Sequence, residues 1–374
     1  MTQFRWKVVY DGKTPPPGAA VAPDERLSWD RTVGIGAQHV VAMFGATFVF
    51  PLIMGLNANL AIMMSGIATI CFLLIVGGQV PSYLGTSASF VGGVASIYAQ
   101  GGGPDDVTGA IFVAGAVLAA VGVIIHYLGA HVVNVVLPPI VTGAVVMLIG
   151  FNLAPVATNT YMPSDPWVAI ITMTAVILMA VGLRGFLGRI AIFLGLIVGY
   201  LASWIADLMF GKTSLPLPGN AAPGPHYRVD WSPVKSADWL GFPPHTPDGL
   251  VGNQATAGNI DAVGWHLPSI HITFVLLVLP AVIALVAENV GHVKAVGEMT
   301  KRDLDPVMGR AVAADGTGTM ITSFVGGSPT TTYAENIGVM AATRVYSTSA
   351  YWVAATVAIV LSLCPKVGAI ISAV

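Results

Sequence analysis

Long apolar runs dominate this chain and restrict what it can fold into. A helix needs about 20 mostly apolar residues to cross a bilayer, and a lipid-exposed barrel strand alternates instead of staying apolar. The runs therefore predict an all-α polytopic membrane protein with about eleven complete spans. We expect these spans at Val33–Gly55, Ala58–Gly78, Leu84–Tyr98, Thr108–Leu128, Val132–Leu153, Trp167–Leu183, Leu187–Phe210, Ile270–Val293, Pro306–Phe324, Ser328–Ala342 and Tyr346–Leu363.

Composition excludes several other classes of protein. Charged residues make up 9% of the 374 residues and hydrophobic residues 55%, whereas soluble domains carry about 25% charge. The net charge of −2 leaves no excess of cations for nucleic acid. Cys71 and Cys364 provide neither a disulfide framework nor a metal-ligand spacing. No nucleophile–base pair or cofactor motif is visible, so we expect a protein that is not an enzyme and has no cofactor or metal.

The distribution of Lys and Arg predicts the orientation in the membrane, because cytoplasmic loops are enriched in these residues. We expect a multi-pass protein of the inner membrane with its N-terminus in the cytoplasm. In this orientation only four cations fall outside the cell: Lys212, Arg228, Lys235 and Lys366. The remaining cations fall inside: Arg5, Lys7, Lys13, Arg26, Arg31, Arg184, Arg189, Lys294, Lys301, Arg302, Arg310 and Arg344.

Three segments lie between or beyond the predicted spans. Residues 1–31 are polar and Pro-rich and predict a cytoplasmic tail. Residues 211–268 are rich in Pro and Gly and predict an extracellular loop. Residues 365–374 resemble the start of a truncated twelfth span.

The third and tenth predicted spans are both interrupted by small polar residues, at Gly85–Ser89 and Gly326–Thr332. They are seven spans apart, and because seven is odd the second half enters the membrane from the opposite side. The pattern predicts an inverted repeat, and paired broken spans are the best sequence pointer to a transporter's substrate site.

Ionisable residues inside spans are costly, so each one is a candidate functional group. Glu288 and His292 are four apart and share one helix face. Glu335 follows the broken tenth span and begins a short helix, where the dipole favours negative charge. Counting depth from Ile270 alone would instead put Glu288 near the cytoplasmic interface. Asp315 and His39 lie within the ninth and first spans and are equally consistent with structural roles.

The tenth span resembles the signature of the nucleobase–ascorbate transporter family. The segment 335–344 reads ENIGVMAATR, and the family signature is Gln, Glu or Pro, then Asn-x-Gly, four free positions, Thr, and Arg, Lys or Gly. Gln38-His39 and the segment 287–292, AENVGH, resemble two further family motifs. Residues 331–336 and 343–348 read most like the uracil permease branch. Ala88 and Ala334 depart from it, since that branch has Phe and Gly there.

The resemblance implies fourteen spans in two inverted sevens, with short antiparallel strands in the broken third and tenth spans. It implies a core domain at 32–128 and 269–364, a gate domain at 129–210, and the absence here of the last gate spans. By the same resemblance, the backbone near Ala88 and Ala334 contacts the base, as do the acids Glu288 and Glu335. The supporting groups would be His292, His39, Gln38, Asn336 and Asp315.

The first functional interpretation is a proton-coupled symporter of nucleobases, with uracil preferred over xanthine because Glu335 resembles pyrimidine carriers. Its expected partners are the nucleobase, protons and the bilayer, and a homodimer is allowed. Two alternatives stay open. One is an anion carrier of the same fold, which the acids disfavour because they would repel an anion. The other is a fragment that binds nucleobases without transporting them.

Overall fold

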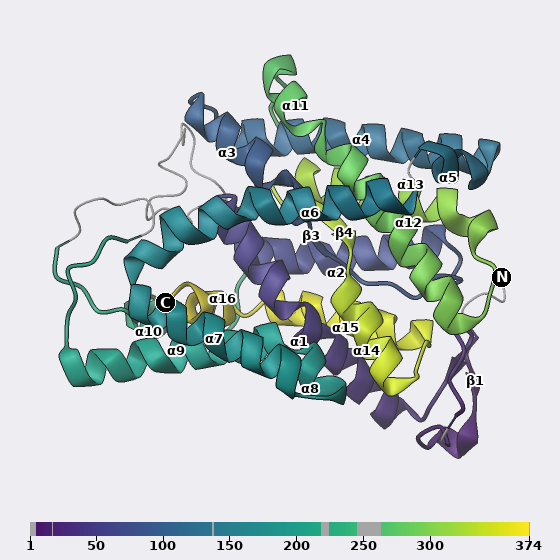
Figure 1. Ribbon diagram of the computed structural model, residues 1–374, viewed down its shortest axis with the longest axis horizontal. Helices are drawn as coiled ribbons and strands as arrows, with labels where there is room; N and C mark the ends of the chain where they lie inside the picture. Colours follow the sequence, from purple (N-terminus) through teal and green to yellow (C-terminus); the bar gives the residue numbers. More distant parts are fainter. Residues whose placement is uncertain (1–4, 17, 137, 218–223, 245–262, 374) are drawn as a thin grey trace.

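The computed structural model describes residues 5–16, 18–136, 138–217, 224–244 and 263–373, and most of them are helical (Figure 1). The longer helices are α1 (Trp29–Ile53), α2 (Ala58–Ile75), α4 (Pro104–Leu128), α6 (Pro139–Pro155), α7 (Pro166–Gly182), α9 (Ala191–Phe210), α12 (Ala281–Thr300), α13 (Asp305–Phe324) and α15 (Thr348–Ser362). The shorter ones are α3 (Val91–Ala99), α5 (His131–Val136), α8 (Gly185–Arg189), α10 (Ser232–Ser236), α11 (Ile272–Val278), α14 (Ala334–Thr343) and α16 (Pro365–Ser372). The strands are β1 (Lys7–Val8), β2 (Glu25–Arg26), β3 (Leu84–Thr86) and β4 (Thr330–Thr332), and 3-10 or π turns lie at Tyr10–Gly12 (η1), Ala88–Phe90 (η2), Val156–Tyr161 (η3) and Met162–Ser164 (η4).

The helices confirm a multi-pass membrane architecture. Within the described residues, six helices are long and apolar enough to cross a bilayer, or seven if α15 and α16, which meet at 81°, form one broken span. The remaining predicted spans are shorter, as in α3 and α14, or more polar, as in α13, which carries Arg310 and Asp315. The span number of eleven therefore stays a prediction.

Two predicted spans are each divided into two helices. The fifth is α5 and α6, which are separated at Pro138 and Pro139, and the eighth is α11 and α12, which are separated at Leu279 and Pro280. A proline in a helix interior removes a backbone donor and clashes with the preceding turn. The eighth span also continues past its predicted end at Val293 to Thr300. Glu288 therefore lies within α12 and not at the end of this helix, and its depth in the bilayer stays a prediction.

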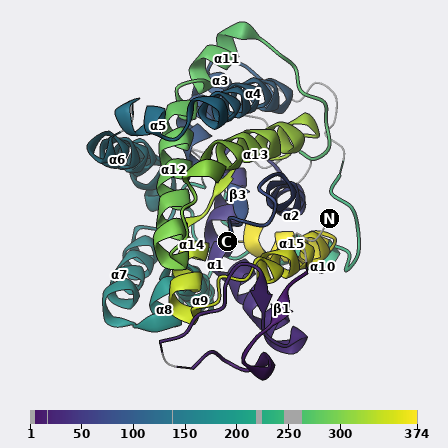
Figure 2. The ribbon, with the colours of Figure 1, turned by 90° about the vertical axis from the view of Figure 1, so that its right-hand side faces the viewer.

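The helices form two groups with α12 between them. Figure 2 shows α6 and α7 on one side of α12, and α2, α4, α13 and α15 on the other. The second group is well packed, whereas α7 contains no buried residue. Its outward side chains are apolar, with Trp167 76% and Val181 84% exposed. Such a surface suits lipid or another apolar partner but not water.

The N-terminal segment is folded against the segments that follow α12 and α14. Val21 forms a β-bridge with Val345, and the Thr348 amide donates to the Pro23 carbonyl at 3.0 Å. Arg302 donates to Asp24 at 2.5 Å, and this interaction lowers the pKa of the Asp24 carboxyl group. The predicted tail thus contacts the segments that follow α12 and α14.

The described part of the long loop after α9 connects elements that are distant in the sequence, and these contacts are separate from those of the N-terminal segment. Arg228 donates to Asp165 at 2.5 Å and to Asp207 at 3.2 Å, which joins the loop to the start of α7 and the end of α9. Further along, His266 is hydrogen-bonded to Thr108 of α4, and burial lowers the pKa of its imidazole. Residues 218–223 and 245–262 of the predicted loop lie outside the described residues.

Helices α4 and α13 approach each other closely through glycines. A Cβ added to Gly122 would lie 2.1 Å from the backbone nitrogen of Ala313, and one added to Gly316 would lie 2.3 Å from that of Ala119. Small residues allow this approach in membranes, where van der Waals packing and not the hydrophobic effect associates helices. The glycines therefore set the position of α13, which carries Asp315.

Gly316→Ala should destabilise the protein by about 3 kcal/mol, because the new methyl group meets backbone that cannot move away without separating the helices. The melting temperature in detergent measures this effect. The matched control is Gly34→Ala in α1, where an added Cβ meets nothing within 4 Å. Equal melting temperatures for the two variants would contradict the packing described here.

Candidate functional site

A two-stranded ribbon joins the two broken spans near the middle of the molecule (Figure 1). Strands β3 and β4 pair antiparallel, with Leu84 opposite Thr332 and Thr86 opposite Thr330. The pairing extends one step beyond each strand, since the Ser87 amide donates to the Pro329 carbonyl at 2.9 Å. Backbone groups at membrane depth need internal partners, and each broken span here satisfies the other. The strands implied by the family resemblance are therefore present.

Each strand is also held by a threonine from a neighbouring helix. The Leu84 amide donates to Thr69 Oγ1 of α2 at 2.9 Å. The Thr330 amide donates to Thr319 Oγ1 of α13 at 3.1 Å, and the same hydroxyl lies 3.0 Å from the Thr330 carbonyl. All of these threonine side chains are buried. They fix the ribbon to the surrounding helices, although threonines within apolar helices carry no sequence signal of this role.

A short helix follows each strand and begins at the ribbon. Turn η2 starts at Ala88 after β3, and α14 starts at Ala334 after β4, with Glu335 in its first turn. The first amides of a helix have no partner within it and carry partial positive charge. Because the strands are antiparallel, these two helix starts lie at opposite ends of the ribbon and provide two sets of donors.

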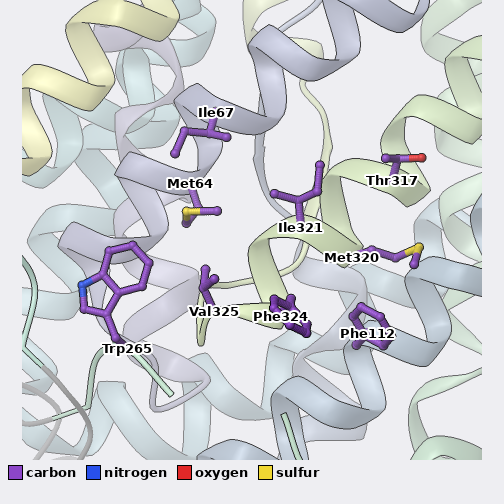
Figure 3. Close-up of a pocket in the computed structure, with 9 residues that line it drawn as sticks. All are labelled: Met64, Ile67, Phe112, Trp265, Thr317, Met320, Ile321, Phe324 and Val325. Carbon is purple, nitrogen blue, oxygen red and sulfur yellow. The ribbon is translucent and has the colours of Figure 1, made fainter. Parts of the chain in front are cut away.

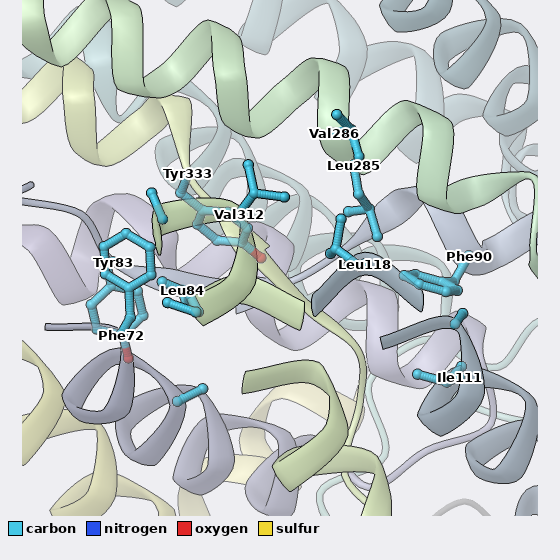
Figure 4. Close-up of a cluster of buried hydrophobic side chains, with 14 of the residues drawn as sticks. Phe72, Tyr83, Leu84, Phe90, Ile111, Leu118, Leu285, Val286, Val312 and Tyr333 are labelled. Carbon is cyan, nitrogen blue, oxygen red and sulfur yellow. The ribbon is translucent and has the colours of Figure 1, made fainter. Parts of the chain in front are cut away.

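Apolar and aromatic side chains surround the ribbon and keep it dry. Tyr333, which links β4 to α14, donates from its hydroxyl to the Thr86 carbonyl at 2.8 Å and accepts from Thr47 at 3.3 Å. The ring therefore ties α1, β3 and α14 together. Figure 4 shows the buried cluster that packs around this region: Phe72, Tyr83, Leu84, Phe90, Ile111, Leu118, Leu285, Val286, Val312 and Tyr333.

Three acids predicted from the sequence lie together beside the ribbon. Glu288 of α12 is close enough to Asp315 of α13 and to Glu335 of α14 for electrostatic interaction. The Thr331 hydroxyl lies beside Glu288 and faces this carboxyl group. Three carboxyl groups at membrane depth cannot all carry charge at low cost, because their repulsion is poorly screened there. The cluster is suited to holding a proton or a hydrogen-bond donor.

A continuous set of buried hydrogen bonds connects this cluster to His292. Asn289 donates to Asp315 Oδ2 at 2.6 Å, and its Oδ1 accepts from Thr332 at 3.2 Å. The Thr332 hydroxyl in turn lies 2.7 Å from His292 Nδ1. The structure thus brings His292 and Asp315 into one network. Asn289 and Thr332 were not among the predicted site residues, although Asn289 follows Glu288 directly and Thr332 lies two residues before Ala334.

His39 and Asn336 form a second polar group on the α1 side of α14. Asn336 Nδ2 lies 3.1 Å from His39 Nδ1 and donates to the His39 carbonyl at 3.0 Å. The His39 ring stacks on Tyr351 with a centroid distance of 4.4 Å. The buried Oε1 atom of Gln38 has no hydrogen-bond partner among the described residues. This group holds α14 against α1, and its member Asn336 follows Glu335 directly in the sequence.

The apolar groove in Figure 3 is a different feature from this site. It has a volume of about 480 Å³ and lies between α2, α4 and α13, with Trp265 at one end. Its exposed surface is entirely apolar. A polar ligand would lose its hydrogen bonds with water there without replacing them, so the groove does not compete with the ribbon as a site for such a ligand.

Across the described chain, no group of three or more His, Cys, Asp or Glu side chains is arranged to hold a metal ion. The site therefore combines helix-start amides, three carboxyl groups and neutral hydrogen-bonding side chains. Such a site can hold a small polar molecule that both donates and accepts hydrogen bonds.

The overall fold is that of a membrane transporter. The transmembrane domain of a cyanobacterium bicarbonate transporter, BicA, matches with a TM-score of 0.60 at 11% identity, covering 92% of this chain and 87% of that one. This similarity supports the fold alone. Residues 31–374 match the family model described as the Permease family, Xan_ur_permease.

Curated relatives agree with this family. A putative pyrimidine permease, RutG, of Escherichia coli is 43% identical over 94% of this chain and 74% of its own length. The uracil permease of Bacillus caldolyticus is 35% identical over 94% of this chain and 75% of its own, and that of Escherichia coli is 32% identical. The chain belongs to this permease family, as its motifs predict, and it is a transporter and not an enzyme.

Thr319→Val should lower the stability by about 1–3 kcal/mol, because an isosteric side chain leaves the buried Thr330 amide without an acceptor. Thr69→Val should do the same to the Leu84 amide. Thermal unfolding in detergent is the measurement. Thr356→Val is the matched control, since that hydroxyl is exposed and bonds only its own helix at the Trp352 carbonyl. Variants that melt with the control would show that the threonines do not hold the ribbon.

Proposed function

We propose that this chain binds a nucleobase at the ribbon and carries it in symport with protons, with uracil or a related pyrimidine as the preferred substrate. The observation that carries this proposal is the grouping of Glu288, Glu335 and the two helix starts around one pair of strands. The names of the relatives, which are pyrimidine and uracil permeases, support the substrate class.

Uracil matches the chemistry of these groups. The base is neutral and planar, with N–H donors and carbonyl acceptors along its edge. Glu288 would accept from the N–H groups, and amides near Ala88 and Ala334 would donate to the carbonyls. Ala334 is exposed and Ala88 is half-buried, so the backbone at both positions is open to a ligand. Hydrogen bonds to an ionised acceptor are stronger than those between neutral groups.

The division into a moving core and a stationary gate is part of the same proposal. We assign residues 32–128 and 269–364 to the core and residues 129–210 to the gate. The separation of α6 and α7 from α2, α4, α13 and α15 supports this division (Figure 2). The matching threonine contacts at β3 and β4 support an inverted repeat, in which the same local arrangement occurs twice.

The orientation follows from the Lys and Arg distribution together with the contacts. We place the N-terminus in the cytoplasm and the protein in the inner membrane. The N-terminal segment contacts Arg302 and the residues after α14, whereas Arg228 and Lys366 are held in contacts of the loop after α9. These contacts group cations that the prediction assigns to the same side of the membrane, which supports the proposed orientation.

An anion carrier of the same fold is the second candidate, because the bicarbonate transporter domain has a similar fold. The crowded acids argue against it, since each would repel an anion in a poorly screened environment. Uptake of bicarbonate or sulfate without nucleobase binding would favour this alternative. Nucleobase binding without uptake into liposomes would favour a binding protein that does not transport.

Glu288→Gln should reduce the affinity for uracil by about 10- to 100-fold, because the ring N–H groups lose a charged acceptor. The measurement is thermal stabilisation by uracil, which rises with ligand concentration over the dissociation constant. Glu298→Gln is the control, since this exposed acid is on the same helix. Undiminished stabilisation of Glu288→Gln would remove that residue from the site.

Uracil uptake into proteoliposomes should depend on the proton gradient. The three acids, Glu288, Asp315 and Glu335, form no ion pair with a basic side chain within the described residues, so one of them can accept a proton when the base leaves. A protonophore should abolish accumulation, while replacing sodium with choline should leave it unchanged. Uptake that resists the protonophore but requires sodium would overturn proton coupling and leave the substrate assignment intact.

A further inference from the structure

The hydrogen bonds around Asn289 determine more than its own position. Its Nδ2 atom faces two acceptors, Asp315 Oδ2 at 2.6 Å and the Leu285 carbonyl at 3.0 Å. Because the Leu285 backbone carbonyl can only accept, the nitrogen of the amide must point toward Leu285 and Asp315, and the oxygen toward Thr332. Asn289 is fully buried, so water cannot substitute for any of these partners.

The orientation of the amide then determines the Thr332 proton. The hydroxyl has one proton and donates it to Asn289 Oδ1 at 3.2 Å. Only the lone pairs of the Thr332 oxygen remain for His292 Nδ1, which is 2.7 Å away. His292 Nδ1 must therefore carry a proton and donate it. In the neutral imidazole the other nitrogen, Nε2, is then the acceptor.

We infer that Asn289 is a positioning residue that, through Thr332, fixes the His292 tautomer with the proton on Nδ1 and so makes Nε2 the atom that can accept a proton during transport. The inference rests on the proposed function for its role in proton coupling, while the tautomer itself is independent of any substrate. His292 and Glu288 share one face of α12 and Asn289 is on the next face, toward α13 and β4.

The ionisable groups around α12 leave this assignment to Thr332. Helix α13 carries Asp305, Arg310 and Asp315, and α14 carries Glu335. Helix α12 itself carries Glu288, Lys294 and Glu298, and none of the acids forms an ion pair with His292 within the described residues. Of the other elements packed on α12, η2, β4 and α6 have no ionisable side chain, and those of α4 lie in its first and last turns: Asp105, Asp106, His126 and Tyr127. The proton on Nδ1 is consequently determined by Thr332 and not by a nearby acid bonded to that atom.

The tautomer can be observed directly. Nitrogen-15 spectra of the detergent-solubilised protein, labelled at histidine and assigned by comparison with His292→Gln, should show the Nδ1–H form for His292. Asn289→Leu should convert the ring to a mixture or to the Nε2–H form. Thr332→Val is the second variant, because it removes the same link while leaving the Asn289–Asp315 bond intact. An Nε2–H ring in the unmodified protein would overturn the inference.

The functional readout is the pH profile of uracil binding, measured by thermal stabilisation in the same samples. Asn289→Leu and Thr332→Val should reduce the affinity by about tenfold at the pH where the unmodified protein binds best and should flatten the profile. Ser323→Ala is the matched control, since this buried hydroxyl bonds the Thr319 carbonyl in its own helix. A tenfold loss with an unchanged profile would indicate a merely structural role and contradict the inference. Absence of uracil binding by the unmodified protein would instead contradict the proposed function, while the tautomer remains measurable.

Discussion

The backbone pairing of β3 with β4 is the interaction on which the rest of the structure depends. A span that stops halfway across a bilayer leaves unpaired amides and carbonyls in a medium that offers no water. Two such spans solve this problem by pairing with each other, at the register Leu84 to Thr332. The pairing also creates the functional opportunity, because each strand ends where a helix begins and exposes amides at membrane depth. Without the ribbon, neither Ala88 nor Ala334 would start a helix in the interior.

The surrounding helices keep the ribbon in place and add its acids. Thr69 and Thr319 bind the two strands from opposite helices, and the close glycine contact between α4 and α13 sets the height of Asp315. Helix α12 then places Glu288 on one face and Asn289 on the next. The carboxyl cluster and the histidine network are thus two parts of one site that share Asp315. In our proposal the carboxyl cluster contacts the ligand, and the histidine network determines which nitrogen of His292 holds the proton.

The sequence predicted those features of the fold and the site that depend on residues close together in the chain. Glycine, serine and threonine within apolar runs identified both broken spans, and the four-residue spacing of Glu288 and His292 identified a shared face. The contacts of Thr69, Thr319 and Asn289 could not be predicted, because their partners are brought near by folding and the residues themselves are ordinary in a helix. The continuation of α12 to Thr300 was missed because Lys294 and Glu298 end the apolar run, although snorkelling side chains allow a helix to continue beyond it.

The most direct test of this account is a structure of the protein with uracil bound, determined by cryo-electron microscopy or crystallography. We expect the base to lie between the starts of η2 and α14, with its ring N–H groups within hydrogen-bond distance of Glu288. A base bound in the apolar groove beside Trp265, or on the α1 side near His39 and away from Glu288, would show that the paired broken spans do not form the substrate site.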